Sequence, residues 1–332
     1  MTQLSGLFAK GRGESRAQKL QEFAQIIKGI NKSVDMKVSS RGWCYLLEGK
    51  NYITKGDFDK AQSTINECRK RGFLPIDFVA QDESRSFDGV EHPNTEDPIS
   101  YFKNLLKAVL QNEDLYTPNW WDGEEYYIQL LVEKIDLKNL FEPICQEYHI
   151  PIATGRGWSD ILQRAEMAQR FKQAEYKNLK PVLLYCGDFD PYGLAISEFL
   201  MKNLMDIMGG TRWSPLGLEV DRFGLNFDFI ESNNLTWIDN LESGSGKNMV
   251  LLENRIVQDY IAEYGERKCE ANALVVVPDA ARDLCRDAIE EWLGNDALDR
   301  FEAKRETVRK TLQEFKERTG AQAIFDKILG QD

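Results

Sequence analysis

The 332-residue sequence has no long hydrophobic run, only two histidines and no closely spaced cysteines. No apolar segment reaches the roughly 18 residues that cross a bilayer, and the opening segment MTQLSGLFAK has no apolar core of signal-peptide length. Two histidines are too few for a multi-histidine metal site, and six scattered cysteines without a CxxC motif are typical of reduced core residues. We therefore expect a cytoplasmic protein with no membrane association.

The net charge of −12 is unevenly distributed along the chain. Residues 1–75 contain 14 Lys and Arg against 7 Asp and Glu, a net of +7, so the remainder carries −19. A basic segment joined to an acidic body is typical of a DNA-contacting module on a soluble scaffold, although ordinary solvated domains reach such charges too. Charge by itself leaves both interpretations open.

The N-terminal part has the apolar spacing of three helices, at residues 14–30, 38–48 and 58–70. The segment FLPIDFV at 73–79 then has the composition of a strand, so a winged helix-turn-helix that binds double-stranded DNA is favoured. An ordinary helical domain with a solvated face is the alternative. The third helix carries the expected contacts to bases and phosphates on its polar face, namely Lys60, Gln62, Asn66, Arg69 and Lys70.

From residue 126 the pattern changes to strands that alternate with helices. Apolar segments at 126–134, 150–154 and 181–186 are each followed by a helical pattern, which predicts an α/β fold with a parallel sheet. The Gly- and Pro-containing segment 86–98 suggests a boundary, so we predict an N-terminal domain at 1–92 and a second domain at 93–332. The second domain would end in a helical extension over 279–328.

Acidic residues follow two of these predicted strands. Glu133 ends LLVEK, and Asp188 and Asp190 end PVLLYCGDFD. Because the carboxyl ends of parallel strands meet at one edge of a sheet, we expect the three carboxylates to lie close together. Mg²⁺ prefers such hard oxygen ligands. A metal site and a solvated turn at the acidic pair are both open from the pattern alone.

Three segments in this order, LLVEK, ATGRGWSD and CGDFDPYG, resemble the Toprim domain of topoisomerase VI A subunits and of the meiotic double-strand-break transesterase. The resemblance covers roughly residues 126–240. It implies that Glu133, Asp188 and Asp190 hold Mg²⁺, with Glu133 also available as a general acid or base. Arg156, in the Gly-rich turn, is a further expected DNA contact.

The same family carries its nucleophile in an N-terminal winged helix, as an Arg followed a few residues later by a Tyr. Arg41-Gly42-Trp43-Cys44-Tyr45 matches that order, so the resemblance implies that Tyr45 is the nucleophile. An arginine one helical turn away would favour the phenolate and neutralise phosphate charge. The alternative is that Tyr45 is a core aromatic residue.

The expected function is therefore Mg²⁺-dependent cleavage of both DNA strands by tyrosine transesterification, in the manner of a type IIB topoisomerase. The resemblance implies a homodimer, in which the tyrosine of one subunit works with the Toprim acids of the other, and a separate ATPase subunit for strand passage. In a prokaryote such a protein would be associated with the nucleoid. A Toprim nuclease that uses metal-activated water, and a non-catalytic DNA-binding subunit of a larger complex, are the alternatives.

Overall fold

A computed structural model describes residues 4, 6–8, 14–80, 95–111, 115–155, 161–239, 241 and 255–329. The contacts divide the chain into two units. The first unit contains Met1–Ser84 and Glu125–Trp292, and the second contains Arg85–Glu124 and Leu293–Asp332. The boundary predicted at residue 92 lies outside the described residues.

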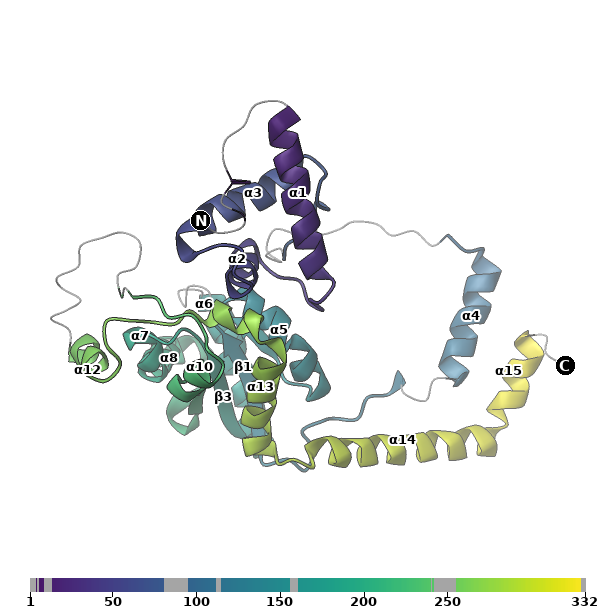
Figure 1. Ribbon diagram of the computed structural model, residues 1–332. Coiled ribbons are helices and arrows are strands. Elements are labelled where there is room, and N and C mark those ends of the chain that lie inside the picture. The colour runs from purple at the N-terminus through teal and green to yellow at the C-terminus, as the bar shows by residue number, and fades with distance from the viewer. Residues whose placement is uncertain are drawn as a thin grey trace. The chain divides into compact units, whose positions relative to one another are not determined.

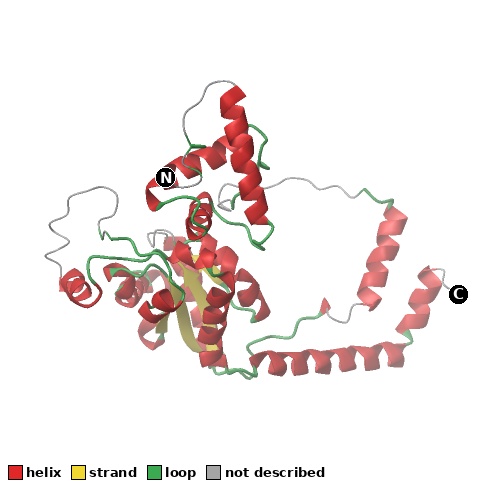
Figure 2. Cartoon of the chain, viewed as in Figure 1, coloured by secondary structure: helices red, strands yellow, loops and turns green. Residues whose placement is uncertain are grey.

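The first unit is built on a four-stranded parallel sheet (Figures 1 and 2). Its strands are β1 (Tyr126–Val132), β2 (Ile152–Thr154), β3 (Lys180–Cys186) and β4 (Glu219–Gly224), in the order β2-β1-β3-β4. Every residue of β1 and β3 after the first is buried, as expected for strands covered on both faces. The predicted α/β class with a parallel sheet is confirmed.

Helices connect the strands and continue beyond the sheet. α5 (Ile135–Glu147) and α6 (Ile161–Tyr176) link the first three strands. The 3₁₀ helix η5 (Ala271–Val276) packs against α2 and α5. The other described helices that follow β3 in this unit are α7 (Pro191–Leu194), α8 (Ile196–Met205), α9 (Met208–Thr211), η4 (Pro215–Gly217), α10 (Phe227–Ser232), α12 (Arg255–Tyr264) and α13 (Pro278–Leu293).

The three N-terminal helices are present as α1 (Glu14–Asn31), α2 (Ser40–Gly49) and α3 (Phe58–Lys70), with the short 3₁₀ helix η1 (Lys55–Asp57) before α3. Ser39 caps α2, since its hydroxyl accepts a hydrogen bond from the Gly42 N–H at 3.1 Å. The apolar stripe predicted for the third helix is buried. α2 is the most enclosed of the three, with six consecutive buried residues.

The strand predicted at 73–79 is wrong, because residues 71–80 form turns and bends. The apolar side chains that suggested a strand pack separately against neighbouring residues. Phe78 stacks on Trp43 with ring centroids 5.0 Å apart, and Leu74 is 2% exposed. Pro75 has no N–H to give to a sheet. No partner strand lies in the described part of 14–80, so the wing of a winged helix is not present there.

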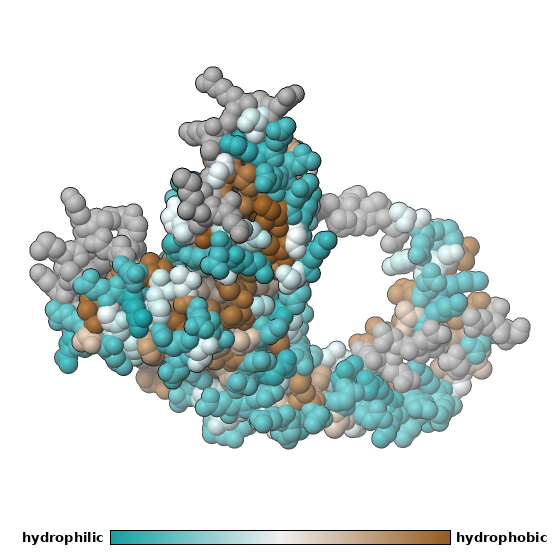
Figure 3. Space-filling view, in the orientation of Figure 1, coloured by the Kyte–Doolittle hydropathy of each residue, from teal (hydrophilic) through white to brown (hydrophobic). Residues whose placement is uncertain are grey.

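The second unit contains α4 (Pro98–Gln111), α14 (Ala297–Thr319) and α15 (Ala321–Leu329). Glu124 forms an ion pair with Arg300 at 2.6 Å and a longer one with Lys304. Trp120 packs on Phe301. The α14 segment has the densely charged sequence that Figure 3 shows as a mostly hydrophilic surface. The predicted helical C-terminus is present as α13, α14 and α15. Among the described helices, none has the length and apolar character to cross a membrane.

Candidate active site

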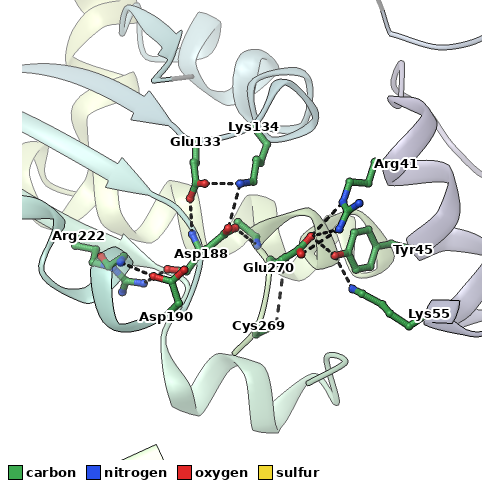
Figure 4. A network of polar contacts seen from close by, with 12 residues as sticks. Arg41, Tyr45, Lys55, Glu133, Lys134, Asp188, Asp190, Arg222, Cys269 and Glu270 are labelled. Atoms are coloured by element: carbon green, nitrogen blue, oxygen red, sulfur yellow. Dashed lines mark hydrogen bonds and ion pairs between the residues drawn. The ribbon is translucent and has the colours of Figure 1, made fainter. Parts of the chain in front are cut away.

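Two of the three predicted acids meet at the carboxyl ends of β1 and β3. The Glu133 N–H donates to the Cys186 carbonyl at 3.0 Å, which continues the pairing of the two strands by one residue. The Asp188 N–H donates to Glu133 Oε2 at 2.9 Å. The parallel sheet therefore brings Glu133 and Asp188 together, as their positions in the sequence predicted (Figure 4).

Lys134 lies against both of these carboxylates. Its Nζ is 3.0 Å from Asp188 Oδ2 and also bonds Glu133 Oε1. Burial raises the pKa of Asp188, and the neighbouring Glu133 charge adds to that rise while Lys134 opposes it. Burial disfavours the Lys134 ammonium, but the charges of Asp188 and Glu133 outweigh it and raise the pKa of Lys134. The pair of acids is thus held around one internal cation.

Asp190 makes a different contact. Its Oδ1 accepts a hydrogen bond from the Gly193 N–H at 2.6 Å, so Asp190 is the N-cap of the short helix α7, with Pro191 in its first turn. Burial raises the pKa of Asp190. Arg222 supports the same loop by donating to the Gly193 carbonyl at 2.8 Å and to the Asp188 carbonyl at 3.2 Å.

Glu133 and Asp188 are the two carboxylates that determine whether this edge of the sheet suits Mg²⁺. Within the described residues, no three His, Cys, Asp or Glu side chains are grouped as a ligand set. Mg²⁺ commonly takes one or two carboxylates from a protein and keeps several waters. Glu133 and Asp188 are hard oxygen donors that already share a cation, the Lys134 ammonium, so this pair fits the donor set of a magnesium site.

Tyr45 lies in α2 with 1% of its surface exposed, and its hydroxyl donates to Glu270 Oε2 at 2.5 Å. Arg41, one turn earlier, donates to the same carboxylate from Nε at 3.2 Å and from Nη2 at 3.0 Å. Lys55 Nζ donates to the Tyr45 hydroxyl at 2.7 Å and lies 4.1 Å from the centre of its ring. Two cations of the N-terminal helices, Arg41 and Lys55, therefore surround one carboxylate and one phenol.

The tyrosine and the acid pair belong to one polar network within the first unit (Figure 4). The connection is the segment 269–271, which precedes and begins η5. Cys269 and Phe189 exchange backbone hydrogen bonds of 2.8 and 3.0 Å, and the Ala271 N–H donates to Asp188 Oδ1 at 2.8 Å. Glu270 thus contacts Tyr45 while its neighbour Ala271 contacts Asp188.

The electrostatics of this network keep Tyr45 neutral. Burial raises the pKa of Tyr45 far above its ordinary value, and the Glu270 carboxylate raises it further. Burial also tends to raise the pKa of Glu270, but the Tyr45 hydrogen bond and the charges of Arg41 and Lys55 bring it below its ordinary value. In this arrangement the chain holds a neutral phenol against a carboxylate, and a neutral phenol is a weaker nucleophile than a phenolate.

The expected DNA contacts of the third helix lie on its accessible side. Lys60, Asn66 and Lys70 are exposed, and Gln62 and Arg69 are half-buried. Arg69 donates to Asn66 Oδ1 at 3.1 Å and to the Ile76 carbonyl, so part of this face is ordered by its own hydrogen bonds. Arg156 lies outside the described residues.

Sequence reasoning missed three charged residues of the network, Lys55, Lys134 and Glu270. Lys134 stands beside Glu133 in LLVEK, so the strand-end position was a usable signal. Glu270 is 225 residues from Tyr45, and the segment EANALVVV has no pattern that indicates the contact. No family model, curated protein or solved structure matches the chain, so the family resemblance is carried by its motifs alone.

Proposed function

We propose that the protein cleaves double-stranded DNA by tyrosine transesterification with Mg²⁺, as a Toprim protein of the topoisomerase VI A type whose tyrosine lies in its N-terminal helices. One observation carries the proposal: the Tyr45 hydroxyl belongs to the same polar network as Asp188, at the carboxyl edge of a parallel sheet. A phenol, an arginine and a pair of carboxylates at one sheet edge are the groups that this reaction uses.

In the proposed reaction the Tyr45 oxygen forms a bond to a DNA phosphorus atom, and the bond from that phosphorus to one sugar oxygen breaks. The leaving sugar oxygen takes up the proton that the phenol loses, so the reaction conserves protons. Arg41 and Lys55 stabilise the charge on the phosphate and on the phenolate, because both donate within the Tyr45 cluster. Glu133 and Asp188 would hold Mg²⁺, which when bound supplies positive charge for the phosphate.

The remaining parts of the proposal concern the partners. The exposed side of α3 supplies Lys60, Asn66 and Lys70 for the DNA backbone. A homodimer would place two tyrosines on the two strands. The network described above joins each tyrosine to the acids of its own chain, which differs from the exchange between subunits that the resemblance implies. A separate ATPase subunit would drive any strand passage.

A second candidate is hydrolysis of DNA by a water molecule at Glu133 and Asp188. The burial of Tyr45 favours it, because a side chain that is 1% exposed and bonded to a carboxylate must move before it can attack a phosphate. The acid pair does not need that movement.

The deciding experiment incubates the protein with supercoiled plasmid and Mg²⁺, stops the reaction with detergent and measures protein-linked DNA ends. Tyrosine transesterification predicts covalent ends with the unaltered protein and none with Tyr45→Phe. Tyr176→Phe is the matched control, since Tyr176 is 77% exposed on α6. Cleavage that persists in Tyr45→Phe without covalent ends would establish hydrolysis instead. No cleavage by any of the three proteins would refute both candidates.

A further inference from the structure

We propose that Arg41, Tyr45 and Lys55 form a binding site for one phosphodiester, and that Glu270 occupies this site in the absence of DNA. The inference depends on the proposed function for the identity of the ligand. It adds a residue, Glu270, that competes with the substrate from within the same chain, and a lysine that binds the phosphate beside Arg41.

The contacts around Glu270 are those that a phosphate requires. Arg41 approaches the carboxylate through Nε and Nη2, with three nitrogen–oxygen distances between 3.0 and 3.2 Å. The guanidinium fork matches carboxylate and phosphate oxygens equally well. The Tyr45 hydroxyl completes the set on the same oxygen, Oε2. A carboxylate with three donors on it has the charge and the spacing of two phosphate oxygens.

The charges around the site also suit an anion from outside. Arg41 and Lys55 bring two positive charges, Glu270 contacts Arg41 directly, and Glu48 acts on Lys55 from beyond ion-pair distance. A DNA phosphate carries the same charge as Glu270 and presents further oxygens. The Arg41 side chain is 43% exposed, whereas that of Glu270 is 16% exposed, so solvent reaches the site from the arginine side.

The exchange begins with a movement of the Glu270 side chain. The backbone of 269–271 is held by the hydrogen bonds between Cys269 and Phe189 and by the bond from Ala271 to Asp188. Glu270 can therefore leave Arg41 by rotating its side chain while the backbone stays in place. When it leaves, Tyr45 loses the carboxylate that keeps its proton in place, and the phosphate takes the position next to the phenol oxygen.

The test compares Glu270→Gln with the unaltered full chain, using a short DNA duplex in binding titrations and a plasmid in the covalent-end assay. Glutamine keeps the shape and removes the competing charge, so the duplex should bind about tenfold tighter or more, the factor that one charge-assisted hydrogen bond represents. Glu198→Gln is the matched control. It removes the same charge from an exposed position on α8, outside the contacts of Arg41, Tyr45 and Lys55, and should change affinity less than twofold.

Two further variants make the result specific. Arg41→Ala in the Glu270→Gln background should abolish the gain in affinity, because the gain requires a freed guanidinium. Glu270→Asp, which keeps the charge on a shorter side chain, should give an intermediate affinity and covers the case in which Glu270→Gln does not fold.

The outcomes separate this inference from the proposed function. Equal or weaker duplex binding by Glu270→Gln, or an equal gain in Glu198→Gln, overturns the inference even if the unaltered protein forms covalent ends. Tighter binding by Glu270→Gln alone supports the inference even if no covalent ends form, in which case transesterification fails. If Glu270 instead served as the base that removes the tyrosyl proton, Glu270→Gln would bind equally and form covalent ends at least about 100-fold more slowly, which also overturns the inference.

Discussion

Replacing Lys134 by methionine tests the cation-binding character of the acid pair directly. Lys134 Nζ contacts both Glu133 and Asp188, and the three side chains are 30%, 29% and 14% exposed. Methionine keeps most of the volume and removes the charge, so the two carboxylates would face each other without a cation. Their repulsion and the burial of Asp188 then both oppose folding.

The size of the effect follows from the exposure of the ion pair. Breaking a fully buried ion pair by removing one partner costs about 3–5 kcal/mol, while exposed pairs contribute about 0–1 kcal/mol. With Lys134 and Glu133 nearly one-third exposed, we expect a loss of about 2 kcal/mol in the free energy of unfolding. For a unit of this size that corresponds to a fall in Tm of roughly 4–8 °C.

Magnesium should reverse this loss. A ligand at 100 times its Kd stabilises the folded state by about 2.7 kcal/mol, so saturating Mg²⁺ should restore most of the Tm of Lys134→Met. In the unaltered protein the gain should be smaller, because the Lys134 ammonium competes with the metal for the same oxygens. The measurement is thermal unfolding with and without Mg²⁺, with Ca²⁺ and Na⁺ as ion controls.

Lys180→Met is the matched control for the perturbation. Lys180 pairs with Glu125 at the opposite ends of the strands, and the two side chains are 64% and 61% exposed. We expect no measurable change in stability and no added response to Mg²⁺. If Lys134→Met is as stable as this control, or if Mg²⁺ shifts both variants equally, the acid pair is not a cation site and the magnesium proposal is refuted.

Three further predictions address other parts of the network. Asp190→Ala should cost about 1 kcal/mol in urea unfolding because it removes the N-cap of α7, whereas a value near zero would contradict the cap. The pKa of Glu270 is lowered below its ordinary value of 4.5, so its stabilising contribution is present above pH 4.5 and is lost as the pH falls through the folded-state pKa. The stability difference between the unaltered protein and Glu270→Gln should therefore shrink below pH 4.5 in urea titrations, and a constant difference would refute the assignment. Replacing Lys60 or Lys70 by glutamine should reduce the slope of log K against log salt for duplex binding by about one unit each, and an unchanged slope would remove α3 from the DNA interface.

The parallel sheet was predictable because its strands are buried on both faces and alternate with helices. Such strands read as continuous apolar segments, and the residue that follows each one must lie at the sheet edge. This is why Glu133 and Asp188 were placed together correctly from their positions alone. The segment 73–79 has a similar apolar content, but its side chains pack beside Trp43 and its backbone pairs with no strand in the described residues. Composition alone cannot distinguish an apolar loop of this kind from a buried strand.

The contacts of Asp190 and Glu270 could not be predicted from neighbouring residues in the sequence. In an ideal extended strand, Asp188 and Asp190 would point the same way, which suggested one cation for both. β3 ends at Cys186, however, and the chain turns into α7, where Asp190 Oδ1 accepts a hydrogen bond from the Gly193 N–H and caps that helix. The direction of a side chain beyond a strand depends on the turn that follows, and Pro191-Tyr192-Gly193 is itself the signal of that turn.

The contact between Tyr45 and Glu270 has a different origin, because it depends on how η5 packs against α2. That packing buries apolar residues of both elements, such as Leu47 and Leu274, which are 0% exposed. Glu270 is largely buried and is paired with Arg41 and Tyr45, as a buried carboxylate must be. The proposal above gives this pairing a role, which is to hold Tyr45 and Arg41 with a carboxylate in place of a phosphate. It also predicts that neutralising Glu270 lowers stability and raises DNA affinity together, two effects that a purely structural glutamate would not combine.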